Sequence, residues 1–176
     1  MNMTQLQKYI IGFAFGLLSM TVTKAQAQFG YINFVNTPPS RYITNGVTMQ
    51  KVAGSNYKVS LYYGANQSSL SAVATASFSA VSGLFNGGLI QLPPYYPGDD
   101  VYVQLRAWYP AIYSSYEAAV ASGDPSLVAG VSSIALKMVG DDVFNDNVSD
   151  LCGFYLQPVA SLGGSLQVTI GAFLNQ

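Results

Sequence analysis

The residues best suited to chemistry in this sequence form two clusters, and the first cluster is aromatic. Tyr102, Arg106 and Trp108 lie an even number of residues apart, so in an extended strand their side chains share one face. Rings that carry a polar group suit stacking against sugars, and this face predicts a carbohydrate-binding platform for an extracellular polysaccharide. Further tyrosines lie on or near neighbouring segments: Tyr62, Tyr95, Tyr96, Tyr109, Tyr113 and Tyr116.

The same aromatic residues also suit a structural role, and this is the interpretation that we favour. Tyrosine and tryptophan often cover a sheet, where the ring packs and the OH or NH group finds a hydrogen-bond partner. In this alternative, Arg106 and Trp108 pack beneath a short helix over 114–121, and Arg106 pairs with Glu117.

The second cluster is acidic and lies in the segment 141–150, which holds half of the carboxylates of a charge-poor chain. Calcium prefers clustered carboxylate, amide and carbonyl oxygens, so a structural calcium site is one interpretation of the segment. The spacing differs from that of an EF-hand loop, and Asp and Asn are common in turns, so the interpretation that we favour is a plain solvated loop. The candidate ligands are Asp141, Asp142, Asn145, Asp146 and Asp150.

Catalytic combinations are scarce. The chain has 0 histidines, which excludes any triad that needs imidazole. A glycosidase needs two facing carboxylates, but the single glutamate, Glu117, has a structural explanation in the predicted helix. We therefore predict that the protein is not an enzyme and holds no cofactor apart from the calcium considered above.

Composition narrows the class of protein further. Only 9% of the 176 residues are charged and the net charge is −1, whereas an average domain has roughly 25% charged residues. A slightly acidic chain is not expected to bind nucleic acid. Cys152 is the single cysteine, which excludes a disulfide scaffold and leaves a buried thiol or a cross-chain disulfide.

The N-terminus predicts export. Residues 1–27 combine a basic Lys8, an apolar run over 9–20 and the small-x-small site Ala25-Gln26-Ala27, as in a cleavable signal peptide. The apolar run is shorter than the roughly 20 residues that a membrane helix needs, and an uncleaved anchor is the alternative. We expect a mature domain over 28–176, secreted or at the cell surface, with no membrane span.

The mature chain has the period-2 alternation of β-strands. In the run 101–108 the expected inward residues are Val101, Val103, Leu105 and Ala107. Similar runs cover 57–63, 133–138 and 165–172, with Ile134, Leu136 and Met138 inward in the second of these. Weaker candidates are 30–36, 75–79, 88–92 and 153–157.

Only one helix is expected among these strands, over 114–121, capped by Ser114 and ended by Gly123. The pattern predicts an all-β fold: a single antiparallel, jelly-roll-like β-sandwich.

Three segments occur in an order that resembles a known family. They are 87–98, with its Gly-Gly and Pro-Gly turns, Val103–Trp108, and Ser115–Ala119. This order resembles secreted bacterial β-sandwich proteins of the exosortase-sorted (PEP-CTERM) group, in which a signal precedes a strand like Phe29–Phe34. The resemblance implies export to a cell surface or matrix and carries over no catalytic residues. The sequence ends at 171–176 without the family's sorting tail, so free secretion or retention by self-association is expected.

Together these features predict an exported, non-enzymatic surface or matrix protein that associates with itself as an oligomer or filament. Charged residues normally keep strand edges apart, and here they are scarce. The strands at 165–173 and 29–36 are the expected edges for pairing with another chain. The alternative function is a carbohydrate-binding module with the aromatic platform described above.

Overall fold

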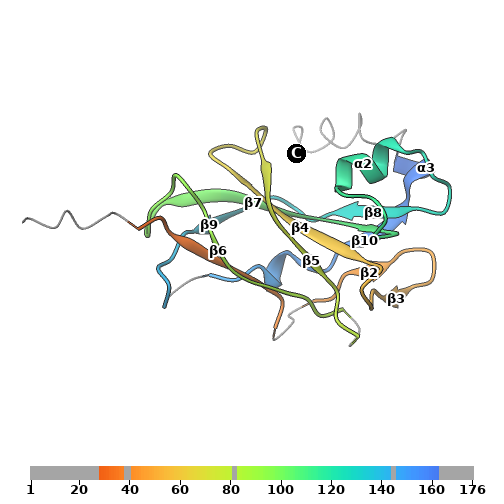
Figure 1. Cartoon of the computed structure of the whole chain (residues 1–176), viewed down its shortest axis with the longest axis horizontal. Helices are drawn as coiled ribbons and strands as arrows, with labels where there is room; N and C mark the ends of the chain where they lie inside the picture. The colour runs from red at the N-terminus through yellow and green to blue at the C-terminus, as the bar shows by residue number, and fades with distance from the viewer. Residues whose placement is uncertain (1–27, 38–40, 81–82, 144–145, 163–176) are drawn as a thin grey trace, which may run out of the picture.

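The computed structural model describes residues 28–37, 41–80, 83–143 and 146–162, and it confirms an all-β fold (Figure 1). The predicted signal segment 1–27 and the predicted strand 165–172 lie outside the described residues. An 8-stranded sheet and a 2-stranded sheet pack in a sandwich-like arrangement. The large sheet has the order β3 (Gln50–Lys51), β2 (Thr44–Asn45), β10 (Tyr155–Pro158), β8 (Val128–Val131), β7 (Asp100–Tyr109), β4 (Lys58–Gly64) and β5 (Ser71–Ser77), with β9 (Ala135–Met138) on β7.

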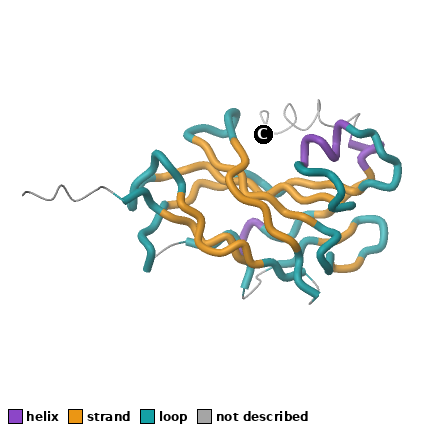
Figure 2. The backbone as a smooth tube through the Cα atoms, in the orientation of Figure 1, coloured by secondary structure: helices purple, strands orange, loops and turns teal. Residues whose placement is uncertain are grey.

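The small sheet pairs β1 (Tyr31–Val35) with β6 (Asn86–Gln91). Strands dominate the backbone, and two short helices, α2 (Tyr116–Ala121) and α3 (Val159–Leu162), lie together at one end of the molecule (Figure 2). A 3₁₀ turn, η1 (Ser149–Leu151), precedes β10. No helix among these described ranges is long and apolar enough to cross a membrane.

Strand β7 organises the large sheet because it pairs with β4 along one edge and with β8 and β9 along the other. Its predicted inward residues, Val101, Val103, Leu105 and Ala107, are all 0% exposed. Ile32 and Phe34 from β1 belong to the same core cluster. The alternation of β7 therefore places one face on the core and leaves the opposite face, called the outer face below, for other contacts.

The predicted orientation of 133–138 is wrong. Leu136 and Met138 are 54% and 60% exposed, whereas Lys137 is only 8% exposed. Pairing with β7 fixes this orientation, because Lys137 lies opposite Val101, whose side chain enters the core. Two carboxylates compensate the lysine, as described below.

Several other strands differ from the sequence prediction. The strand expected at 75–79 is β5, which begins at Ser71, and β2, β3 and β8 were not predicted. The sheet is also not purely antiparallel, because β10 pairs with β2 in parallel. Strands of two to four residues carry too few positions to show a period-2 pattern, so long-range pairing defines them.

The predicted helix is confirmed, with a corrected cap. Ser115, not Ser114, is the N-cap, and its Oγ accepts a hydrogen bond from Ala118 N at 3.1 Å. Glu117 therefore falls one position short of the capping-box site, and its carboxylate is directed to the sheet instead. Gly123 follows the helix with φ 64°, in the left-handed region that favours glycine.

Candidate functional site

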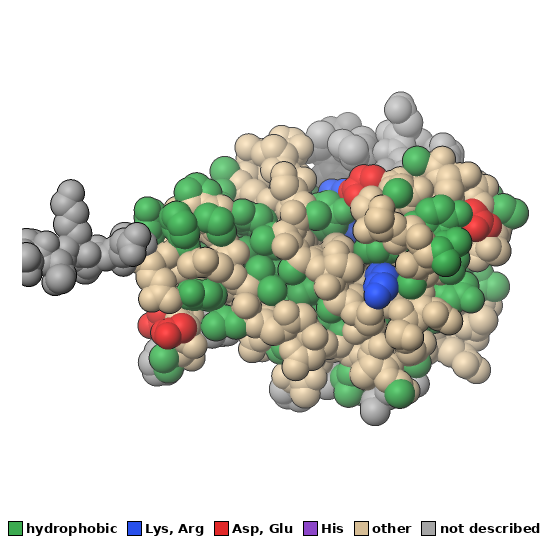
Figure 3. All heavy atoms as spheres, in the orientation of Figure 1, with side chains coloured by type: hydrophobic (Ala, Val, Ile, Leu, Met, Phe, Trp, Pro, Cys, Tyr) green, Lys and Arg blue, Asp and Glu red, His purple; other side chains and the backbone are tan. Residues whose placement is uncertain are grey.

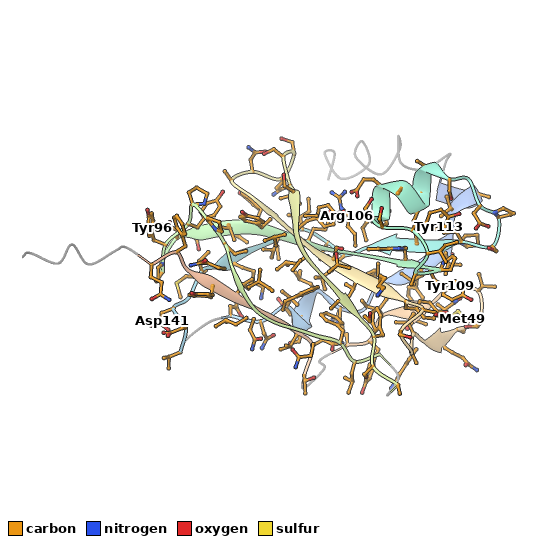
Figure 4. The ribbon with its side chains drawn as sticks, in the orientation of Figure 1. Met49, Tyr96, Arg106, Tyr109, Tyr113 and Asp141 are labelled. Carbon is orange, nitrogen blue, oxygen red and sulfur yellow. The ribbon has the colours of Figure 1, made fainter. Side chains whose placement is uncertain are left out.

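The outer face of the large sheet carries the aromatic cluster. Tyr102, Gln104, Arg106 and Trp108 alternate along β7 on this face, and the register places Tyr62 of β4 opposite Gln104. Helix α2 lies over the part of this face near Trp108, and Arg106 is close to the helix (Figure 4). The outer face therefore has two halves: α2 covers the half that holds Arg106 and Trp108, and the half that holds Tyr102 lies beside β9.

Trp108 does not belong to a solvent-facing platform. Its side chain is 1% exposed and its Nε1 donates a hydrogen bond to the Tyr113 carbonyl oxygen at 3.2 Å. It packs in a second cluster with Tyr116, Ala119 and Leu127. The prediction that Tyr102, Arg106 and Trp108 form one solvent-facing platform is therefore wrong, because Trp108 is buried. Trp108 packs beneath the helix, as the structural interpretation expected.

Arg106 and Glu117 pair as that alternative predicted. The Arg106 Nη1 atom is 2.7 Å from Glu117 Oε1. The Tyr62 hydroxyl lies 2.8 and 2.7 Å from the two carboxylate oxygens and donates to them. The Arg106 guanidinium lies 4.0 Å from the centre of the Tyr62 ring and also donates to Gln104 Oε1. This network fastens α2 to β4 and β7.

The electrostatics of this network favour its present protonation state. Burial and the hydrogen bond to Glu117 raise the pKa of the Tyr62 hydroxyl, so it stays a donor at neutral pH. Burial alone would raise the pKa of Glu117, but the hydrogen bond from Tyr62 and the charge of Arg106 outweigh it and hold that pKa below its ordinary value. The polar groups of Tyr62, Arg106 and Glu117 therefore bond mainly to one another and to Gln104.

Tyr102 lies in the other half of the outer face. It is half-buried and pairs with Gly64 of β4 on one side and Leu136 of β9 on the other. Leu136 and Met138 are exposed beside it. Tyr102 and Arg106 therefore both lie on the outer face. Strand pairing explains the position of Tyr102, and the ion pair with Glu117 explains that of Arg106.

The acidic segment is divided between different partners and does not form the predicted calcium site. Lys137 Nζ lies 2.9 Å from Asp150 Oδ1 and 3.1 Å from Asp146 Oδ2, so an ammonium group occupies the space between these carboxylates. Asp141 accepts a hydrogen bond from Val143 N, and Asp142 is exposed. Asn145 lies outside the described residues, and within the described ones no group of three or more His, Cys, Asp or Glu could hold a metal ion.

The Lys137 cluster joins β9 to the segment around η1. Burial alone would lower the pKa of Lys137, but the hydrogen bonds to Asp150 and Asp146 outweigh it and raise that pKa above its ordinary value. The lysine is therefore charged at neutral pH, and the calcium prediction is corrected on a physical ground: the carboxylates already have a cation.

Cys152 is a buried thiol. It is 2% exposed and unpaired with any other cysteine, and burial raises its pKa to about 12. The thiolate that forms disulfides is therefore scarce at neutral pH, which disfavours the cross-chain disulfide.

The strand edges differ from those expected. β1, within the predicted edge 29–36, is covered on both sides: β6 pairs with it on one side, and bridges join Tyr31 to Gly140 and Asn33 to Asn147. The other expected edge, 165–173, lies outside the described residues. The longest strand at an end of the large sheet is β5, which pairs with β4 alone among the described strands.

The β5 edge was not expected from the sequence, because strand order depends on pairing between distant residues. Its sequence, Ser-Ala-Val-Ala-Thr-Ala-Ser, holds no charge and no proline, and this was the one available signal.

Comparisons with protein-family models, curated proteins and solved structures give no match to this chain.

Proposed function

We propose that this protein is an exported, non-enzymatic structural component of a cell surface or extracellular matrix, and that it associates with copies of itself. The observation that carries the proposal is the uncharged side of the sandwich formed by β5 and β6. These consecutive strands each lie at the edge of their sheet, and neither contains a charged residue. Most of the surface over them is apolar or uncharged (Figure 3).

The charged groups support a structural role because many of them brace the fold. Arg106 and Lys137 are in ion pairs with acids from other segments. Asp124 accepts hydrogen bonds from Ser126 and Tyr113, and Asp99 accepts one from Tyr96 N. The carboxylates in these contacts stabilise turns and helices, which fits a scaffold better than general acid–base chemistry.

The predicted signal peptide and the resemblance to exosortase-sorted proteins support the location. Cleavage after Ala27 would release a chain that begins at Gln28. N-terminal analysis of the protein recovered from the medium or cell envelope tests this part. A chain that keeps residues 1–27, or stays in the cytoplasm, contradicts it.

Sedimentation velocity of the mature protein over a wide concentration range tests self-association. We expect a concentration-dependent oligomer that persists at high NaCl, because an interface without charge is little affected by screening. A monomer at all concentrations, with no protein retained in the matrix fraction, would overturn the proposal.

A further inference from the structure

We propose that the C-terminal segment 163–176 folds back over the outer face of the large sheet and covers a row of apolar side chains on β8 and β9. This docking is separate from the proposed self-association, which rests on β5 and β6. The row, called the outer row below, consists of Ala129, Val131, Leu136 and Met138.

Strand pairing places the outer row on the outer face. Each member lies opposite a residue of β7 whose side chain is on this face, from Trp108 at one end to Asp100 at the other. Ala129, beneath α2 and α3, is 0% exposed. The other three members are 42%, 54% and 60% exposed, in chain order. The row is therefore covered at its Trp108 end and open at its Asp100 end.

The open end of the row has the composition of a covered surface. On β9, Leu136 and Met138 face outward while Lys137 faces the core, the reverse of a strand whose outer face meets water. Strands that are apolar toward both faces are typical of sheets with both faces covered. A segment over the Asp100 end would bury side chains that the described residues leave exposed.

The described part of the chain ends beside the covered end of the row. Val159, the first residue of α3, is buried in one cluster with Trp108 and Ala129, and its N–H donates to Leu127 O at 3.0 Å. α3 ends at Leu162. A segment joined to the protein at this point meets the row at an effective concentration of roughly millimolar, whereas a second copy or another partner must be supplied at that concentration. The favoured occupant is therefore the segment that follows in the same chain.

The sequence of 163–176 fits the row in pattern, charge and length. Gly163 and Gly164 allow the chain to reverse after α3. The segment holds no charged residue, so no charge opposes its burial. The row extends along β7 from Asp100 to Trp108, about 26 Å in a strand, and the residues 165–172 reach nearly as far when extended. The alternating apolar side chains that would contact the row are Leu166, Val168, Ile170 and Ala172.

Oxidation of methionine tests the coverage directly. Cleavage after Ala27 leaves Met49 and Met138 in the mature chain, and both are exposed among the described residues. Hydrogen peroxide converts an accessible methionine to the sulfoxide, which mass spectrometry of peptides quantifies. We expect Met138 of the mature protein to react about tenfold more slowly than Met49, because burial of a few apolar side chains holds the segment in place. Equal rates would overturn the proposal.

Two matched variants of the full mature chain test whether the segment is the cover. Val168→Asp puts a charge on the apolar side of the run 165–172, and it should bring the oxidation rate of Met138 to that of Met49. Thr169→Asp puts the same charge on the opposite side and should leave Met138 protected. Circular dichroism and the Met49 rate establish that each variant keeps its fold. If both variants leave Met138 protected, something other than this segment covers it and the proposal is wrong.

A disulfide distinguishes docking within one chain from docking on a second copy. Ala172 would lie at the Asp100 end of the row, near Met138, so oxidation of a Met138→Cys, Ala172→Cys protein should give a disulfide within one chain. The buried Cys152 stays unreactive. A monomer that migrates faster in a non-reducing gel is the expected result. A disulfide-linked dimer would contradict docking within the chain and support the proposed self-association, and no disulfide in either form would contradict the docking alone.

Discussion

Two charged clusters fasten short segments to the large sheet, near opposite ends of β7 and on opposite faces of the sheet. Arg106 lies on the outer face and holds α2 through Glu117 and Tyr62. Lys137 lies on the core side, opposite Val101, and holds the segment around η1 through Asp146 and Asp150. The Arg106 side chain is 23% exposed and that of Lys137 is 9% exposed.

The comparison shows how a charge-poor protein uses its few charges. A cation within a sheet is tolerated where a segment that follows in the sequence supplies the acid, as Glu117 follows β7 and Asp146 follows β9. Loss of Lys137 leaves two neighbouring carboxylates without their cation, whereas loss of Glu117 leaves one cation that is already partly solvated. The two clusters should therefore respond differently to substitution.

The largest expected effect lies beneath α2. Trp108→Ala removes the ring that packs against Tyr116 and Leu127, and we expect a loss of about 3–5 kcal/mol in the free energy of unfolding. Chemical denaturation monitored by circular dichroism measures it. Trp108→Phe, which keeps most of the volume and removes the hydrogen bond to Tyr113, should cost less. Equal losses for the two variants would contradict a role in packing.

Substitution of the buried lysine should have the next largest effect. Lys137→Met keeps much of the side-chain volume and removes the charge that compensates Asp146 and Asp150. Because these two carboxylates are half-exposed and can rehydrate, we expect a loss of about 2 kcal/mol, below the 3–5 kcal/mol typical of fully buried pairs.

The triple variant Lys137→Met, Asp146→Asn, Asp150→Asn supplies the control, since it removes the uncompensated charges and should recover part of the stability. Millimolar calcium should leave the melting temperature of the native protein unchanged. Stabilisation by calcium that depends on Asp146 and Asp150 would restore the metal site rejected above.

These clusters also show what sequence reasoning can and cannot supply. The Arg106–Glu117 pair was predictable, because the alternation of 101–108 and the helix that follows place both side chains on one face. Lys137 was assigned to the wrong face because apolar Leu136 and Met138 dominate the pattern of 133–138. Its position depends on the register with Val101 and on acids several residues further on, which periodicity does not encode.

The aromatic cluster shows the same limit. The sequence placed Trp108 correctly on the face opposite Val101, but burial of that face depends on how α2 and α3 fold over it. The β5 edge was likewise hidden, since the order of strands follows from pairing between distant residues.

The smallest stability effect concerns the exposed pair and its dependence on pH. Glu117 is about half-exposed, so Glu117→Gln should cost about 1 kcal/mol or less at pH 7. The folded protein holds the pKa of Glu117 below its ordinary 4.5, so its contribution is present above that pH and is lost as the pH falls through the folded pKa. The stability difference between native and Glu117→Gln proteins should therefore disappear in acid.

Lys137 should behave in the opposite way. Its pKa is raised above the ordinary 10.5, so its contribution is complete below that value and is lost only as the pH rises through the folded pKa. Urea titrations of native, Glu117→Gln and Lys137→Met proteins from acid to mildly alkaline pH separate the two clusters. On the alkaline side of this range the Lys137→Met difference should stay constant. A Lys137→Met difference that faded between neutral pH and pH 9 would mean that the lysine loses its proton early, and the contrast between a buried and a solvated cluster would fail.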